Sequence, residues 1–247
     1  ADAVIHTTDL DCGQVFAHLP EAMQRGLIDE REIDEALARL LTIRFRLGMF
    51  DPEENDPYAT LPYSVLESPA HKAHALRLAQ ESMVLLKNDG ILPLQHNLTR
   101  IVVLGPNADN PEVQLGNYNG FPSEIVTPLE GIRAKTGAEV LYLQASDYTE
   151  ATCAGGEIDR ALEGADLAIF VGGISPRLEG EEGDAGRNAP EGFAGGDRTS
   201  IRLPRAQTEV MRHIHEAGIP LVFVSMSGSA LAFPWEAEHA DAILQAW

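Results

Sequence analysis

The chain has 247 residues, and its 18 Lys and Arg against 38 Asp and Glu give a formal charge of −20. A hydrophobic content of 44% and a charged content of 23% exclude wholesale disorder, and the length allows one or two domains. The acidic excess argues against nucleic acid and against an anionic membrane surface as partners. The longest apolar runs fall well short of the roughly 20 residues needed to span a bilayer.

The first part of the sequence is predicted to be helical, over residues 14–48. Val15, Leu19, Met23 and Leu27 recur at the spacing of one helix face, and Gly26 stands where that helix would end. A second helix is expected to begin after Asp29, because Glu32 follows three residues later, as in a capping box. Its apolar positions predict a buried stripe, which consists of Ile33, Leu37, Leu40, Leu41, Ile43 and Leu47.

The next segment carries weaker periodic signals. Residues 51–69 are rich in Pro, Asp, Asn and Tyr and are predicted to be a linker or a surface connection. A helix is expected over residues 70–87, and the following Asn88-Asp-Gly90 is a strong turn signal.

From residue 100 the pattern changes to short, continuous apolar runs separated by helical stretches. The runs, typical of strands buried on both faces, cover 101–104, 140–143, 167–171, 221–225 and 242–244. Helices are predicted at about 127–136, 157–164 and 204–217. This alternation predicts an α/β fold, an open and mostly parallel sheet that begins at about residue 97. Since both ends stop within a pattern, we expect the chain to be a fragment of a larger protein.

The loops that follow the strands are the expected places for chemistry, because ligands bind beyond the carboxyl ends of parallel strands. The connection over residues 172–203 is unusually long and contains Glu179, Glu181, Glu182 and several other acidic residues. Residue type alone favours a solvated acidic loop held by salt bridges. The functional alternative is a carboxyl group that acts as a general acid/base.

The remaining motifs argue against several functions: nucleotide binding, serine hydrolysis and metal binding. Gly105-Pro-Asn-Ala108 lacks the dinucleotide fingerprint, so a Rossmann-like nucleotide module is disfavoured and no cofactor is expected. Ser227 lacks the preceding glycine of a serine hydrolase. His213 and His215 have the wrong spacing to share a metal, and two cysteines, Cys12 and Cys153, make neither a metal set nor a disulfide framework. No metal site is predicted.

Several segments together resemble glycoside hydrolase family 3, in the family's order and over nearly the whole chain. They are Asp9-Leu-Asp-Cys-Gly13, Arg44-Phe-Arg-Leu-Gly-Met-Phe-Asp51, Glu81-Ser-Met-Val-Leu-Leu-Lys-Asn-Asp-Gly-Ile-Leu-Pro-Leu94, Val103-Leu-Gly-Pro-Asn-Ala-Asp109, Leu115-Gly-Asn-Tyr-Asn-Gly120, Val126-Thr-Pro-Leu-Glu-Gly131, Gly195-Gly-Asp-Arg198, Leu203-Pro204 and Pro234-Trp235. The resemblance implies that residues 1–50 are the last helical part of a TIM-like barrel. Residues 51–96 would then be a linker with a connecting helix, and 97–247 an incomplete α/β sandwich domain.

The resemblance also implies a retaining mechanism, in which an Asp of the barrel attacks the anomeric carbon and a Glu of the second domain is the acid/base. The Asp motif and the sugar-gripping residues of the barrel lie outside this sequence. Aligning the family's Glu-x-Glu with Leu178-Glu-Gly-Glu-Glu-Gly183 places the acid/base at Glu181, with Glu179 and Glu182 as alternatives. Glu179, Arg177 and Arg198 are the expected substrate-binding residues, although an insertion separates Asp197-Arg198 from the glutamates.

The implied function is an exo-acting β-glycosidase that releases terminal β-linked glucose or xylose from an oligosaccharide or small β-glycoside. Its partner would be the remaining barrel of the same protein. A non-catalytic carbohydrate-binding member of the same fold is the alternative, since fold does not fix function. Substrates derived from polysaccharides indicate an extracytoplasmic location, periplasmic or secreted.

Overall fold

The computed structural model describes residues 14–116, 118–179, 189–195 and 197–247. The chain divides into two compact units, Ala1–Leu66 and Glu67–Trp247. Within the described residues, no helix combines the length and the apolar character needed to cross a membrane.

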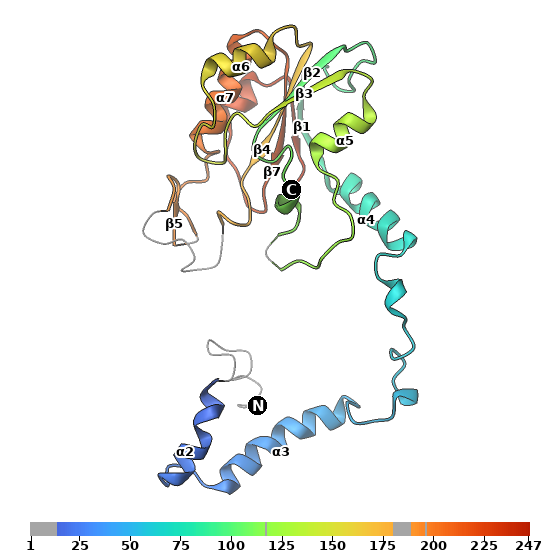
Figure 1. Cartoon of the computed structure of the whole chain (residues 1–247), viewed down its shortest axis with the longest axis vertical. Coiled ribbons are helices and arrows are strands. Elements are labelled where there is room, and N and C mark those ends of the chain that lie inside the picture. The colour runs from blue at the N-terminus through green and yellow to red at the C-terminus, as the bar shows by residue number, and fades with distance from the viewer. Residues whose placement is uncertain (1–13, 117, 180–188, 196) are drawn as a thin grey trace. The chain divides into compact units, whose positions relative to one another are not determined.

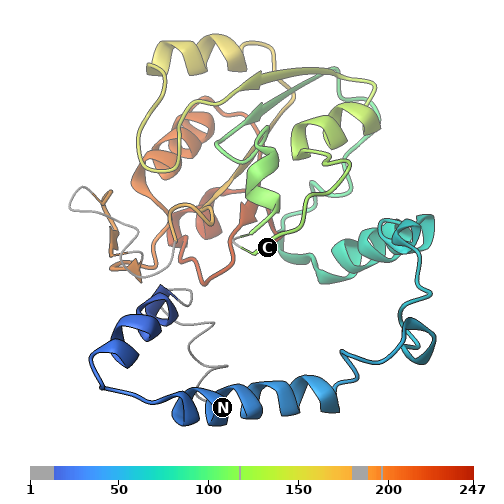
Figure 2. The same cartoon turned by 60° about the horizontal axis from the view of Figure 1, so that its bottom comes forward.

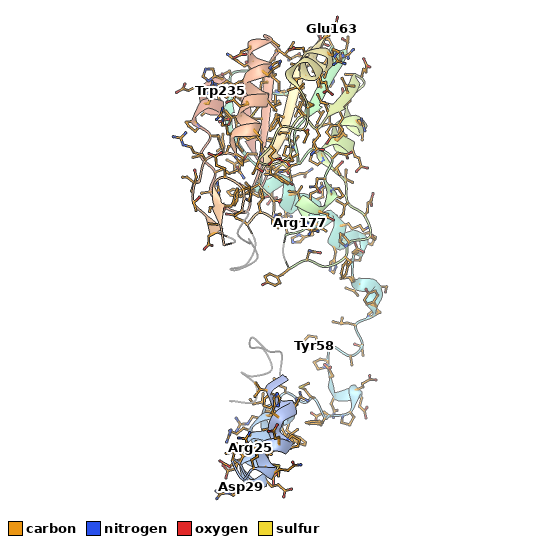
Figure 3. The ribbon with its side chains drawn as sticks, turned by 60° about the vertical axis from the view of Figure 1, so that its left-hand side comes forward. Arg25, Asp29, Tyr58, Glu163, Arg177 and Trp235 are labelled. Carbon is orange, nitrogen blue, oxygen red and sulfur yellow. The ribbon has the colours of Figure 1, made fainter. Side chains whose placement is uncertain are left out.

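The first unit is helical, as predicted. Its elements are η1 (Gln14–His18), α2 (Leu19–Gln24), α3 (Glu30–Arg46), η2 (Glu53–Asn55) and η3 (Tyr63–Val65). The capping box is confirmed: the backbone N–H of Glu32 donates to Asp29 Oδ1 (3.1 Å), and that of Asp29 donates to Glu32 Oε2 (3.0 Å). Arg25 and Asp29 flank the turn that joins α2 to α3 (Figure 3).

Two expectations for this unit need correction. The first predicted helix is split into a 3₁₀ turn and a short α-helix, because Pro20 fits the first turn of a helix but has no N–H to continue one. The predicted stripe along α3 is not buried: Leu37 is 46% exposed and Leu47 is 70% exposed. No residue of α3 is buried, although Ile33, Leu40 and Leu41 are partly covered.

The second unit is built on a six-stranded sheet. Figure 1 shows strands of this sheet with helices α6 and α7 on one side and α5 on the other. Its strands follow the order β1-β8-β7-β4-β2-β3, and every neighbouring pair is parallel except β1 with β8. The strands are β1 (Val84–Asn88), β2 (Arg100–Leu104), β3 (Glu139–Leu143), β4 (Leu167–Gly173), β7 (Leu221–Met226) and β8 (Ala242–Gln245); β5 (Phe193–Ala194) and β6 (Asp197–Arg198) form a separate hairpin. The predicted mostly parallel α/β sheet is confirmed.

Helices cover both faces of this sheet. Its helices are α4 (Pro69–Ser82), η4 (Pro111–Gln114), α5 (Pro128–Lys135), α6 (Gly155–Leu162), α7 (Arg205–Glu216) and α8 (Pro234–His239). On one face α6 and α7 pack Ile158 and Ile214 against Phe170 and Phe223, and on the other α5 packs Leu129 against the sheet. Figure 2 shows from a second direction that α5 and α7 lie on opposite sides of the sheet.

The predicted helix over 70–87 is wrong at its C-terminal end. The helix ends at Ser82, and Val84–Asn88 is instead the edge strand β1, antiparallel to β8. Short apolar runs fit both periodicities, and pairing with a strand more than 150 residues away decides between them here. The sheet therefore includes residues that precede the expected start at 97.

A single carboxylate fastens the start of β2 to the start of β4. Oδ2 of Asp166 accepts hydrogen bonds from the Thr99 N–H (2.6 Å), the Thr99 hydroxyl (2.7 Å) and the Arg100 N–H (2.9 Å). The backbone hydrogen bond from Thr99 is the largest cause that lowers the pKa of this carboxyl below its ordinary value. Since the folded-state pKa is the lower one, these bonds stabilise the fold above the unfolded-state pKa. That stabilisation is lost as the pH falls through the folded-state pKa.

We therefore expect Asp166→Ala to lower the unfolding temperature at neutral pH, with a difference that narrows as the pH falls below about 3.9. Thermal unfolding followed by circular dichroism across this range measures the effect. Glu163→Ala, which removes an exposed carboxylate from the same connection, is the matched control. A difference from the parent that stays constant with pH would contradict the role given to the Asp166 charge.

Candidate active site

A cavity of about 680 Å³ lies beyond the carboxyl ends of β4 and β7, where an open parallel sheet is expected to bind ligands. It belongs entirely to the second unit. Its walls come from η4 and the residues after it, the turn after β4, the β5–β6 hairpin and the loop after β7. The lining residues are Val113, Gln114, Leu115, Gly116, Ile174, Ser175, Pro176, Glu179, Asp197, Arg198, Met226, Ser227, Gly228, Ser229 and Trp247.

The turn after β4 places Glu179 in this cavity. The backbone N–H groups of Leu178 and Glu179 both donate to the Ser175 carbonyl, at 3.0 and 3.2 Å, so the chain folds back directly after the strand. The side chain of Glu179 is half-buried, and its Oε1 accepts a hydrogen bond of 2.6 Å from the Ser229 hydroxyl. The predicted substrate-binding glutamate therefore lies in a cleft, held by a donor from another loop.

Arg198 reaches the same cavity from the short hairpin. Its guanidinium donates to the Ala230 carbonyl (2.6 Å), the Arg202 carbonyl (3.3 Å) and the Ser229 hydroxyl (3.3 Å). It also lies 5.9 Å from the centre of the Phe193 ring. Arg198 thus ties the hairpin to the loop after β7, and it meets Glu179 through Ser229.

Arg177 does not line the cavity that Glu179 and Arg198 share. It forms an ion pair with Glu112, with Nη2 2.7 Å and Nε 2.9 Å from one carboxylate oxygen, and both side chains are largely exposed. Figure 3 shows Arg177 at the opposite end of the sheet from Glu163, which precedes β4.

The cavity beside Arg177 has a volume of about 560 Å³ and shares part of its wall with the first. Tyr148 lines it as well, and burial raises the pKa of the Tyr148 phenol. Asn110 Nδ2 donates to that phenol oxygen at 3.2 Å. The two adjoining cavities offer room for two neighbouring groups of one ligand.

Two of the glutamates singled out from the sequence, Glu181 and Glu182, lie outside the described residues. Glu179 is the last described residue before them. Ser229 connects the two site residues. Its loop was expected to lie at the edge of the sheet where ligands bind, because it follows a buried strand, but no role was predicted for Ser229 itself.

Comparison with known proteins identifies the family. The model of the glycosyl hydrolase family 3 C-terminal domain matches residues 83–247. The chain belongs to glycosyl hydrolase family 3. It is 28% identical to a xylan 1,4-beta-xylosidase of Xylanibacter ruminicola, over 99% of this chain and 45% of that protein. It is 36% identical to a probable exo-1,4-beta-xylosidase of Neosartorya fischeri, over 92% of this chain and 28% of that protein. The chain thus spans less than half the length of these relatives.

Solved structures show the same fold. A family 3 exo-beta-xylosidase, in complex with a xylobiose aziridine probe, matches with a TM-score of 0.77 and 29% identity, over 99% of this chain and 30% of that one. A beta-glucosidase from Listeria innocua, in complex with laminaribiose, matches with a TM-score of 0.69 and 26% identity, over 93% of this chain and 30% of that one. The implied α/β sandwich of the family is confirmed for the second unit.

Proposed function

We propose that this chain is part of a retaining exo-β-glycosidase that releases terminal β-linked xylose or glucose. The placement of Glu179 in the cleft carries the proposal, because Glu179 is the first residue of the glutamate-rich segment predicted to supply the acid/base. Glu181 is the proposed acid/base, with Glu179 and Glu182 as alternatives. Membership in family 3 and likeness to xylosidases and glucosidases support this class of reaction.

The proposed reaction has two steps. An Asp carboxylate, from a part of the protein outside this sequence, attacks the anomeric carbon while Glu181 gives its proton to the departing glycosidic oxygen. Water then attacks the same carbon and gives a proton to Glu181. This second displacement releases the Asp and restores the Asp carboxylate and the protonated Glu181. Glu179 and Arg198 would hold the sugar, and Arg177 would contact the neighbouring group of the substrate from the adjoining cavity.

We further propose that residues 1–50 are the end of a barrel domain and that the segment from residue 51 leads to the sandwich domain, whose sheet begins at Val84 and not at the predicted 97. The exposed apolar side chains of α3 support this assignment, since an amphipathic helix is stable when its stripe is covered. In this arrangement the remaining barrel of the same protein covers Leu37 and Leu47.

The stereochemistry of the first product tests the reaction class. The complete enzyme is mixed with xylobiose, and in a separate reaction with laminaribiose, and proton NMR follows the anomeric signals before mutarotation. We expect the β-anomer to form first, because two successive displacements restore the starting configuration. An initial α-anomer, or no hydrolysis of either disaccharide, would contradict the proposal.

A further inference from the structure

The hydroxyl of Ser229 stands between the two described site residues with opposite charges. It donates to Oε1 of Glu179 at 2.6 Å and accepts from Nη1 of Arg198 at 3.3 Å. A hydroxyl has one proton and two lone pairs, so the single proton of Ser229 is committed to the carboxylate. The Arg198 donor polarises the hydroxyl in the direction that strengthens its bond to Glu179.

The loop that carries Ser229 is held on both sides, so its hydroxyl is a positioned donor. After Ser229, Arg198 Nη1 binds the Ala230 carbonyl at 2.6 Å, and the Ala232 N–H donates to the Ile201 carbonyl at 2.8 Å. Before it, Gln245 Nε2 of β8 donates to the Ser227 hydroxyl at 3.3 Å. Ser229 itself is half-buried.

Glu179 has fewer restraints of its own. Its backbone belongs to a turn that leaves the end of β4, and its N–H returns to the Ser175 carbonyl. A glutamate side chain has three rotatable bonds, and ordering it costs conformational entropy. A charge-assisted hydrogen bond from a fixed donor offsets that cost and selects one orientation.

We infer that Ser229 is a positioning residue. Held by Arg198, it fixes Glu179 in the cleft so that the other oxygen of that carboxylate, Oε2, accepts a hydrogen bond from a hydroxyl of the bound sugar. The inference rests on the proposed glycosidase function and adds the group that prepares the site for its substrate. Ser229 acts only through Glu179 and does not touch the reacting atoms.

The test is a double-mutant cycle in the complete enzyme, with Ser229→Ala, Glu179→Gln and the two combined, assayed on 4-nitrophenyl β-xyloside and β-glucoside. We expect Ser229→Ala to lower kcat/KM by about ten- to hundredfold, mostly through KM, because a hydrogen bond to a charged group is lost. Ser229→Thr keeps the hydroxyl and is expected to restore most of the activity. Because Ser229 acts through Glu179, the double variant is expected to be no worse than Glu179→Gln alone.

Ser200→Ala is the matched control, because it removes an exposed hydroxyl from the segment next to Arg198 without removing a donor to Glu179. It is expected to keep parental activity. Equal unfolding temperatures for the parent and for Ser229→Ala exclude loss of fold as the cause. If Ser229→Ala is inactive because it does not fold, Ser229→Cys takes its place with and without Glu179→Gln, because a thiol has nearly the same shape but is a much weaker donor to the carboxylate.

The outcomes separate the two proposals. Suppose that the parent enzyme is active. If Ser229→Ala then leaves kcat/KM unchanged, or if the losses of the two single variants multiply in the double variant, the positioning role is overturned and the glycosidase proposal stands. A well-folded parent that hydrolyses neither glycoside overturns the proposed function, and the inference with it.

Discussion

Replacing Glu181 by Gln is expected to lower kcat/KM on alkyl β-glycosides by roughly a hundredfold to ten-thousandfold. Glutamine has nearly the same shape but cannot donate a proton to the glycosidic oxygen. An alkoxide is a poor leaving group, so the first displacement depends on that proton. An activated aryl glycoside departs as a stable phenolate, and its kcat/KM, which reports the steps through formation of the glycosyl-enzyme, should fall far less.

The measurement is the ratio of the two losses, determined with methyl and 4-nitrophenyl glycosides of the same sugar. Glu179→Gln and Glu182→Gln are the matched variants, since they remove the alternative carboxyl groups of the same loop. The acid/base is the residue whose replacement gives the strong dependence on leaving group. If Glu181→Gln loses equal activity on both substrates, or loses none, Glu181 is not the acid/base. If none of the three variants loses more activity on the methyl glycoside than on the 4-nitrophenyl glycoside, the acid/base does not lie in this loop.

The strands were predictable because burial on both faces leaves a continuous apolar run, as in Leu167–Gly173, all of which are buried. The edge strand Val84–Asn88 was not. It is largely exposed, it follows directly on a helix, and it is a strand only because Ala242–Gln245 pairs with it. Such a pairing between distant segments has no local signature. The stripe of α3 shows the opposite error, because periodicity indicates which side chains would pack together but not whether a second layer is present.

The site was predictable in part for a similar reason. The length and acidity of the loop after β4 singled out the loop, and the resemblance to family 3 singled out Glu179 within it. The order of the strands explains why this loop lies beside the one after β7. The hydrogen bond from Ser229 joins residues 50 positions apart. It depends on the register of β4 with β7, in which Gly173 lies opposite Met226, and a register cannot be read from either strand alone.

In that register the end of β4 leaves no room for a side chain at Gly173, so Gly173→Ala is expected to be severely destabilising. A Cβ on Gly173 would clash with the carbonyl oxygen of Met226, a backbone atom, and the φ of Gly173 is +129°. The peptide cannot easily move away, because Gln207 binds the Gly173 N–H (2.8 Å) and its carbonyl (2.7 Å). We expect a loss of about 3–5 kcal/mol, the sum of overpacking and backbone strain. This is a large share of a typical domain's stability.

Gly164→Ala separates the two causes. Gly164 also has a positive φ, +71°, but a Cβ there would meet no atom within 4 Å, so its replacement should cost only about 1 kcal/mol. Urea unfolding of the two variants and the parent measures both losses. Comparable losses in the two variants would show that β4 and β7 can separate at Gly173 without cost. A much larger loss of unfolding free energy at Gly173 would show that only glycine permits the contact between Gly173 and Met226. That contact would then fix the cleft wall that carries Met226 and Ser227, and it would hold the base of the loop that carries Ser229.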